Sequence, residues 1–82
     1  MDDRDLERRI VADASVMTGK PVIRGTRITV DFILSLLAHG YNERDILDEY
    51  DSLTADDIRA CLLFATHSLE NTAFMPLMPE PA

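Results

Sequence analysis

The sequence predicts a mainly α-helical domain that begins with a short β-hairpin and continues into three helices. Two short β-prone segments, residues 8–13 and 26–29, flank a loop in which Pro21 and two glycines interrupt any helical period. Between residue 30 and about residue 70, three segments each follow a helix-capping residue and repeat apolar side chains at spacings of three and four. This is the periodicity of helices with one buried face.

The hairpin is expected to form from "RRIVAD" (8–13), centred on Ile10 and Val11, and "TRIT" (26–29), which can pair with it in antiparallel fashion. Thr29 can cap the first helix and Gly40 can end it. Asn42 can cap the second helix, and Thr54 with Asp57 makes a capping box for the third. The predicted buried faces are Val30, Ile33, Leu34 and Leu37, then Ile46, Leu47 and Tyr50, then Ile58, Cys61, Leu62, Ala65 and Leu69.

Three regions follow from this pattern: a frayed, charged N-terminus (1–7), a single domain (8–70) and a Pro-rich apolar tail (71–82), called here the Pro-rich segment. The third helix contains "ACLLFA" (60–65), which places Leu63 and Phe64 on top of the core stripe. A chain of 82 residues buries a modest share of its surface. We therefore expect a homodimer with Leu63 and Phe64 in its interface.

Charge is distributed unevenly along the chain, whose net charge is -7. Residues 31–82 hold ten acids against Arg44 and Arg59, so the whole molecule is a poor non-specific ligand for nucleic acid. The other six basic residues all precede residue 30, and they are Arg4, Arg8, Arg9, Lys20, Arg24 and Arg27.

The residue types that carry catalysis or bind metals are sparse. Cys61 is the single cysteine and falls on the apolar stripe, while His39 and His67 each lie near a helix end without a partner at a recognisable spacing. The acids at 48–51 lack the alternation of a calcium loop. We expect no enzymatic activity, no cofactor, no metal and no small-molecule substrate. The absence of a secretory or membrane-spanning apolar run predicts a cytoplasmic protein without membrane contact.

Three stretches, "GKPVIRGTRITVDFILSLLAHG", "ILDEY" and "LTADDIRACLLFA", together resemble the domain-of-unknown-function 433 family over residues 8–69. The resemblance implies a β-hairpin followed by a trihelical, helix-turn-helix-like bundle of the winged-helix or homeodomain kind. It also implies a prokaryotic antitoxin that binds and neutralises a PIN-like ribonuclease toxin in a type II toxin–antitoxin pair, and that often represses its own promoter.

DNA contact is expected from the N-terminal basic residues, because the helix after the turn begins with "TADDIRA", whose acids repel phosphates. The candidates are Arg8, Arg9, Lys20, Arg24 and Arg27. In the alternative interpretation, these side chains pair with acidic helices of the same chain or of its dimer mate.

Toxin contact is expected from the apolar anchors of the Pro-rich segment, which are Phe74, Met75, Leu77 and Met78. The alternatives are a dispensable tail or one that packs on its own dimer. A second function also stays open: a dimeric protein-interaction module with helix-turn-helix shape and no role in DNA binding.

Overall fold

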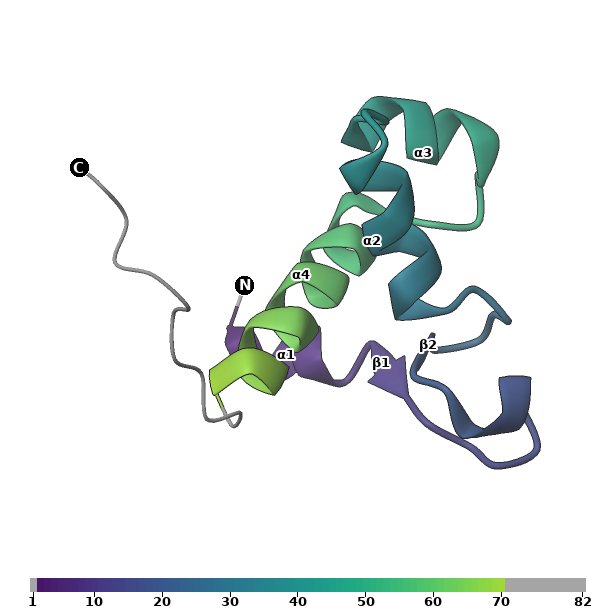
Figure 1. Ribbon diagram of the computed structural model, residues 1–82, viewed down its shortest axis with the longest axis vertical. Coiled ribbons are helices and arrows are strands. Elements are labelled where there is room, and N and C mark those ends of the chain that lie inside the picture. The colour runs from purple at the N-terminus through teal and green to yellow at the C-terminus, as the bar shows by residue number, and fades with distance from the viewer. Residues whose placement is uncertain (1, 71–82) are drawn as a thin grey trace, which may run out of the picture.

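The computed structural model describes residues 2–70 and has a small antiparallel hairpin beside a group of helices (Figure 1). Among these residues, no helix is long and apolar enough to cross a membrane. The elements in chain order are α1 (Asp3–Glu7), β1 (Ile10–Val11), the 3-10 turn η1 (Met17–Gly19), β2 (Val22–Ile23), α2 (Val30–Ala38), α3 (Glu43–Glu49) and α4 (Ala55–Glu70). The predicted fold, mainly helical after an N-terminal hairpin, is confirmed.

The hairpin forms with a different second strand from the one that the sequence predicts. β1 pairs antiparallel with Val22–Ile23, in the register Ile10 to Ile23 and Val11 to Val22, and not with residues 26–29. Gly25 has a φ of +80°, which turns the chain back directly after β2. Residues 28–29 therefore return along the other side of β2, where Val22 bridges to Thr29.

Local capping sets the helix starts where the sequence predicts them. The Thr29 hydroxyl accepts the Phe32 amide at 3.2 Å and begins α2. Asn42 begins α3 through a capping box in which its side chain accepts the Asp45 amide at 2.8 Å. At α4, the Thr54 amide donates to the Asp57 carboxylate at 2.9 Å, as in a capping box.

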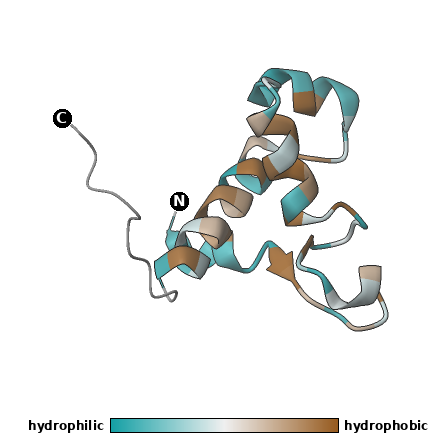
Figure 2. Ribbon diagram, in the orientation of Figure 1, coloured by the Kyte–Doolittle hydropathy of each residue, from teal (hydrophilic) through white to brown (hydrophobic). Residues whose placement is uncertain are grey.

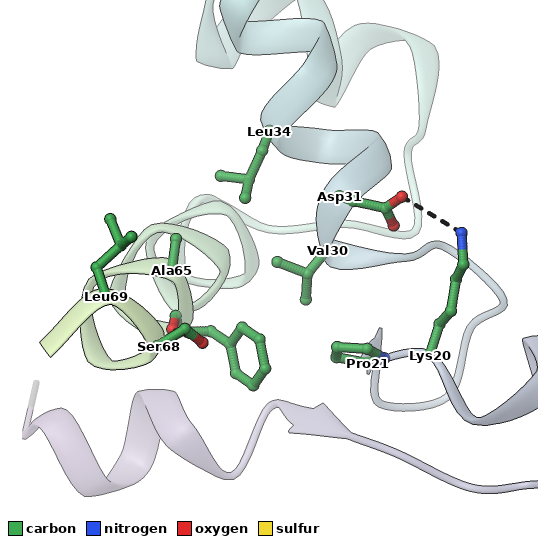
Figure 3. A pocket seen from close by; sticks show the side chains of 9 residues that line it. Lys20, Pro21, Val30, Asp31, Leu34, Ala65, Ser68 and Leu69 are labelled. Atoms are coloured by element: carbon green, nitrogen blue, oxygen red, sulfur yellow. Dashed lines mark hydrogen bonds and ion pairs between the residues drawn. The ribbon is translucent and has the colours of Figure 1, made fainter. Parts of the chain in front are cut away.

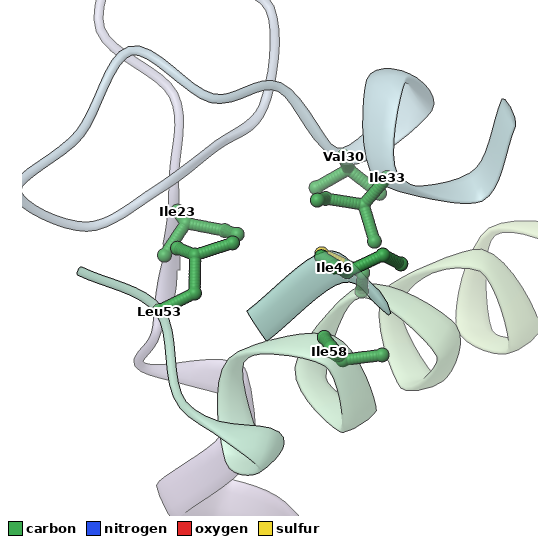
Figure 4. Packing of buried hydrophobic residues seen from close by; sticks show 7 residues of the cluster. Ile23, Val30, Ile33, Ile46, Leu53 and Ile58 are labelled. Carbon is green, nitrogen blue, oxygen red and sulfur yellow. The ribbon is translucent and has the colours of Figure 1, made fainter. Parts of the chain in front are cut away.

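The hydrophobic core lies between the hairpin, α2, α3 and the first half of α4 (Figure 4). Leu62 and Leu69, which the sequence assigns to this core, are instead 46% and 66% exposed. Figure 2 shows that apolar residues nevertheless continue along α4 beyond the core. The core side chains are Ile23, Val30, Ile33, Ile46, Leu53, Ile58 and Cys61.

The expected frayed N-terminus is wrong for residues 3–7, which form α1. Asp2 caps this helix, and its one apolar residue, Leu6, is only 9% exposed. α1 packs against the C-terminal half of α4, where Glu7 lies 3.2 Å from the Nδ1 atom of His67 (Figure 1). A single apolar side chain among charged neighbours is a weak sequence signal, and burial against a distant helix decides the outcome.

We expect Leu6→Ala to lower the free energy of unfolding by about 2 kcal/mol or more, because it removes buried apolar volume between α1 and α4. The measurement is a urea titration followed by circular dichroism. Asp3→Ala, at an exposed position of the same helix, serves as the matched control and should change the value by no more than roughly 0.5 kcal/mol. An equally small effect of Leu6→Ala would mean that α1 does not contribute to the folded domain.

Candidate binding groove

A groove of about 490 Å³ opens between the loop before α2, the first turns of α2 and the second half of α4 (Figure 3). Its size falls within the range of roughly 300–1,000 Å³ that is typical of ligand pockets. Most of its lining is apolar, and one charged pair lies at its edge. The lining residues are Lys20, Pro21, Val30, Asp31, Leu34, Phe64, Ala65, Ser68 and Leu69.

The capped helices create the two walls of this groove. Since Thr29 fixes the start of α2, Val30 and Leu34 follow at an i, i+4 spacing and share one face. The opposite wall comes from α4, where Phe64 is 36% exposed. Pro21 completes the apolar surface from the loop, held close to α2 because its carbonyl oxygen accepts the Val30 amide at 3.0 Å.

The charged edge of the groove consists of Lys20 and Asp31, whose Nζ and Oδ2 atoms are 3.5 Å apart. Both side chains are more than half exposed. The pKa of Asp31 is lowered, first by a hydrogen bond with the Thr29 side chain and then by the nearby Lys20 ammonium. The groove therefore has an ionised pair at one end and an apolar floor (Figure 3).

Arg9 is half-buried, and its guanidinium group is engaged by two acidic side chains of α4. Its Nη1 atom donates to Asp57 Oδ1 at 3.0 Å, and its Nη2 atom lies 3.8 Å from Asp56 Oδ2. Asp57 is only 7% exposed, so this pair joins the β1 region to the buried start of α4. For Arg9, the geometry matches the alternative in which basic residues pair with the acidic helices.

The other predicted DNA contacts divide between the groove and the hairpin. Lys20 lies at the groove edge. Arg24 and Arg8 come together, because the Arg24 Nε–H donates to the Arg8 carbonyl oxygen at 2.7 Å. Arg8 also lies 3.6 Å from Asp5, and Arg27 is exposed after the turn at Gly25.

The predicted protein contacts are placed only in part. Leu63 is half-buried, whereas Phe64 lines the groove. The predicted toxin contacts Phe74, Met75, Leu77 and Met78 lie outside the described residues. The sequence did not reveal the groove, because its two helical walls are separated by thirty positions or more. Its one local signal is the apolar surplus on the third predicted helix.

The described residues offer little for catalysis or metal binding. Burial, and then the nearby Asp57 carboxylate, raise the pKa of the Cys61 thiol to about 12. At neutral pH this cysteine is therefore a protonated core residue and not a thiolate nucleophile. His39 Nδ1 lies 2.7 Å from the Ser35 carbonyl oxygen within its own helix. Between residues 2 and 70, no cluster of three His, Cys, Asp or Glu side chains could hold a metal ion.

Comparisons with a family model and with a solved structure point to the same family. The family described as "Protein of unknown function (DUF433)" matches residues 10–65. The crystal structure of a DUF433 member from Anabaena variabilis has a TM-score of 0.73 and 28% identity, and the match covers 82% of this chain and 66% of that one.

Two curated relatives also match, and both are uncharacterized proteins. The protein y4eO of Sinorhizobium fredii is 33% identical over 66 residues, which is 79% of this chain and 30% of that protein. A protein of Archaeoglobus fulgidus is 70% identical over 23 residues, which is 28% of this chain and 64% of that protein. The aligned part thus spans less than two thirds of either relative.

Replacing Arg9 with Met should lower the free energy of unfolding by about 1–3 kcal/mol, because a buried carboxylate then loses its charged hydrogen-bond partner. Urea unfolding provides the measurement. Arg8→Met, at the exposed neighbouring position, is the control and should have an effect below roughly 0.5 kcal/mol. In an Asp57→Asn background, Arg9→Met should lower the free energy of unfolding by a smaller amount. Equal costs in both backgrounds would contradict the assigned ion pair.

Proposed function

The chain belongs to the DUF433 family, and from that premise we propose that it is a cytoplasmic, non-enzymatic antitoxin that binds and neutralises a PIN-like ribonuclease toxin. The observation that carries the proposal is the apolar surface along the second half of α4. Phe64 and Leu69 line the groove and are 36% and 66% exposed, and Leu62, near the middle of the same helix, is 46% exposed. Large exposed apolar patches on a small domain are typical of protein interaction sites.

Charge complements this apolar surface. Nine acids against Arg44 and Arg59 in residues 31–70 give the helical part of the chain a negative field. A ribonuclease carries basic groups for its RNA substrate, and an acidic partner is attracted to those groups and masks them. We assign the tight contacts to Phe74, Met75, Leu77 and Met78, which follow α4 in the chain.

Repression of the protein's own promoter is the second part of the proposal. Arg9 is engaged with Asp57, and Lys20 with Asp31, so these two side chains have acidic partners within the chain. Arg8, which lies 3.6 Å from Asp5, and Arg24 and Arg27 are exposed at the hairpin edge. Two copies of this edge in a dimer would give a basic surface that contacts phosphates.

A dimeric interaction module without DNA binding is the second candidate function. The internal ion pairs of Arg8, Arg9 and Lys20 favour it, because they engage three of the five cationic groups assigned to DNA. The exposed Leu62 also offers apolar area to a second copy. The two functions differ in whether the chain binds a toxin and whether it binds promoter DNA.

The first functional test replaces Phe74, Met75, Leu77 and Met78 together with serine in the full chain. Each buried side chain of this kind contributes roughly 1.5–3 kcal/mol, so the affinity for a PIN-like ribonuclease toxin should fall by about a thousandfold or more. Calorimetric titration measures the affinity, and rescue of growth measures neutralisation. The control is Thr72→Ser with Glu80→Gln, which should retain both. Full rescue by the serine variant would rule out toxin capture by this segment.

The second test concerns promoter binding. Replacing Arg24 and Arg27 with Ala should weaken the binding of promoter DNA and flatten the dependence of log K on log salt by about 0.9 for each lost phosphate contact. Arg44→Ala, on the acidic α3, is the matched control. An unchanged salt slope, or no promoter binding by the unmodified protein, would favour the interaction module.

A further inference from the structure

We propose that the Pro-rich segment of the chain docks into the groove between α2 and α4 of the same molecule, so that the protein covers its own groove when no partner is bound. This inference concerns the free protein and does not depend on which partner it binds. Three features carry it: the period of the segment, its point of attachment and the chemistry of the groove.

The Pro-rich segment contains a three-residue repeat, "FMP" followed by "LMP". A polyproline II helix has three residues per turn, so Phe74 and Leu77 share one edge about 9 Å apart. Pro76 and Pro79 form a P-x-x-P pair on another edge and favour this conformation before docking. The segment can therefore present two apolar side chains in a row at a low ordering cost.

The attachment point brings these side chains to the groove. Leu69, the penultimate residue of α4, is itself part of the groove wall. From the end of α4 back to Phe64 the helix rises about 9 Å. Residues 71–73 can span about 10 Å when extended. A chain that turns back after α4 therefore places Phe74 beside the groove wall, with Leu77 one polyproline turn further in.

The groove offers the surface that such a strand requires. Polyproline segments dock in grooves lined by aromatic and apolar side chains, and here Phe64, Val30 and Leu34 provide them. Lys20 lies at the edge away from Leu69 (Figure 3). Glu80 falls on the same edge of the segment as Phe74 and Leu77, one turn beyond Leu77, so its carboxylate approaches Lys20, which shares that end of the groove with Asp31.

A second copy of the chain is a poorer occupant of the groove itself. Nine residues line the groove, whereas a stable protein interface engages about 20–30 residues on each side. A tethered segment needs much less contact, because a short linker gives an effective concentration of the order of millimolar. Even an intrinsic Kd of about 1 mM would keep the segment docked about half of the time.

The test uses the full chain with a nitroxide attached at Ala82→Cys and records the amide spectrum of the uniformly labelled protein. We expect selective loss of intensity at the groove residues Val30, Leu34 and Ala65, with the amides of α3 unaffected. The unmodified chain, passed through the same labelling, controls for reaction at Cys61. Its buried thiol, with a pKa of about 12, should stay unmodified.

Adding Phe74→Ser and Leu77→Ser to the nitroxide-labelled chain is the matched control for docking. The intensity of the groove amides should recover, while unchanged α3 signals show that the domain remains folded. Uniform broadening, or selective loss that persists in this variant, would overturn docking through these anchors. So would broadening in a mixture of isotope-labelled chains without nitroxide and unlabelled chains with nitroxide, because the segment of a second copy would then fill the groove. No toxin enters this measurement, so docking and neutralisation can fail independently.

Discussion

The ion pair between Arg9 and Asp57 joins the residue before β1 to the first turn of α4. Asp57 uses one carboxylate oxygen to cap α4 with Thr54 and the other to accept Arg9 at 3.0 Å. Its negative charge lies in the first turn of α4, where the helix dipole favours it. With Arg9 bound to Asp57, β1 lies beside α4. The pairing of β2 with β1 then positions β2 and the loop that follows it before α2. The pair thus helps to place the loop at one edge of the groove, while α2 and α4 also pack directly on each other.

The same pair explains why the start of α4 is acidic in a domain of helix-turn-helix shape. In a DNA-reading protein, this helix presents its first turns to bases and phosphates. Here Asp56 and Asp57 face Arg9, and Asp56 also accepts Arg59 at 3.2 Å. Their role is internal, and fold resemblance alone does not make this helix a reading helix. We therefore assign any nucleic-acid contact to the basic side chains of the hairpin and not to the first turn of α4.

Features set by neighbouring residues were predictable from the sequence, and those set by distant contacts were not. The caps at Thr29, Asn42 and Thr54 follow from side-chain chemistry within three positions, and the structure has all three. The sequence placed the second strand at residues 26–29 because short β-prone segments can pair in several registers. In the structure β1 pairs instead with Val22 and Ile23, which are buried. The docking of Leu6 and the groove itself arise only when α4 meets α1 and α2. The family, in contrast, was recognisable from its motifs.

The length of α4 links binding to stability. Its buried residues end at Cys61, yet the helix continues to Glu70. A helix gains most of its stability from packing on an apolar face. α1 packs on only part of α4 beyond Cys61, through the buried Leu6. Among residues 2–70, Phe64 and Leu69 line the groove and do not pack in the core. A ligand that fills the groove therefore adds packing to the last turns of α4. Because it binds the folded state alone, it also raises the free energy of unfolding by RT ln(1 + L/Kd), where L is the concentration of the free ligand.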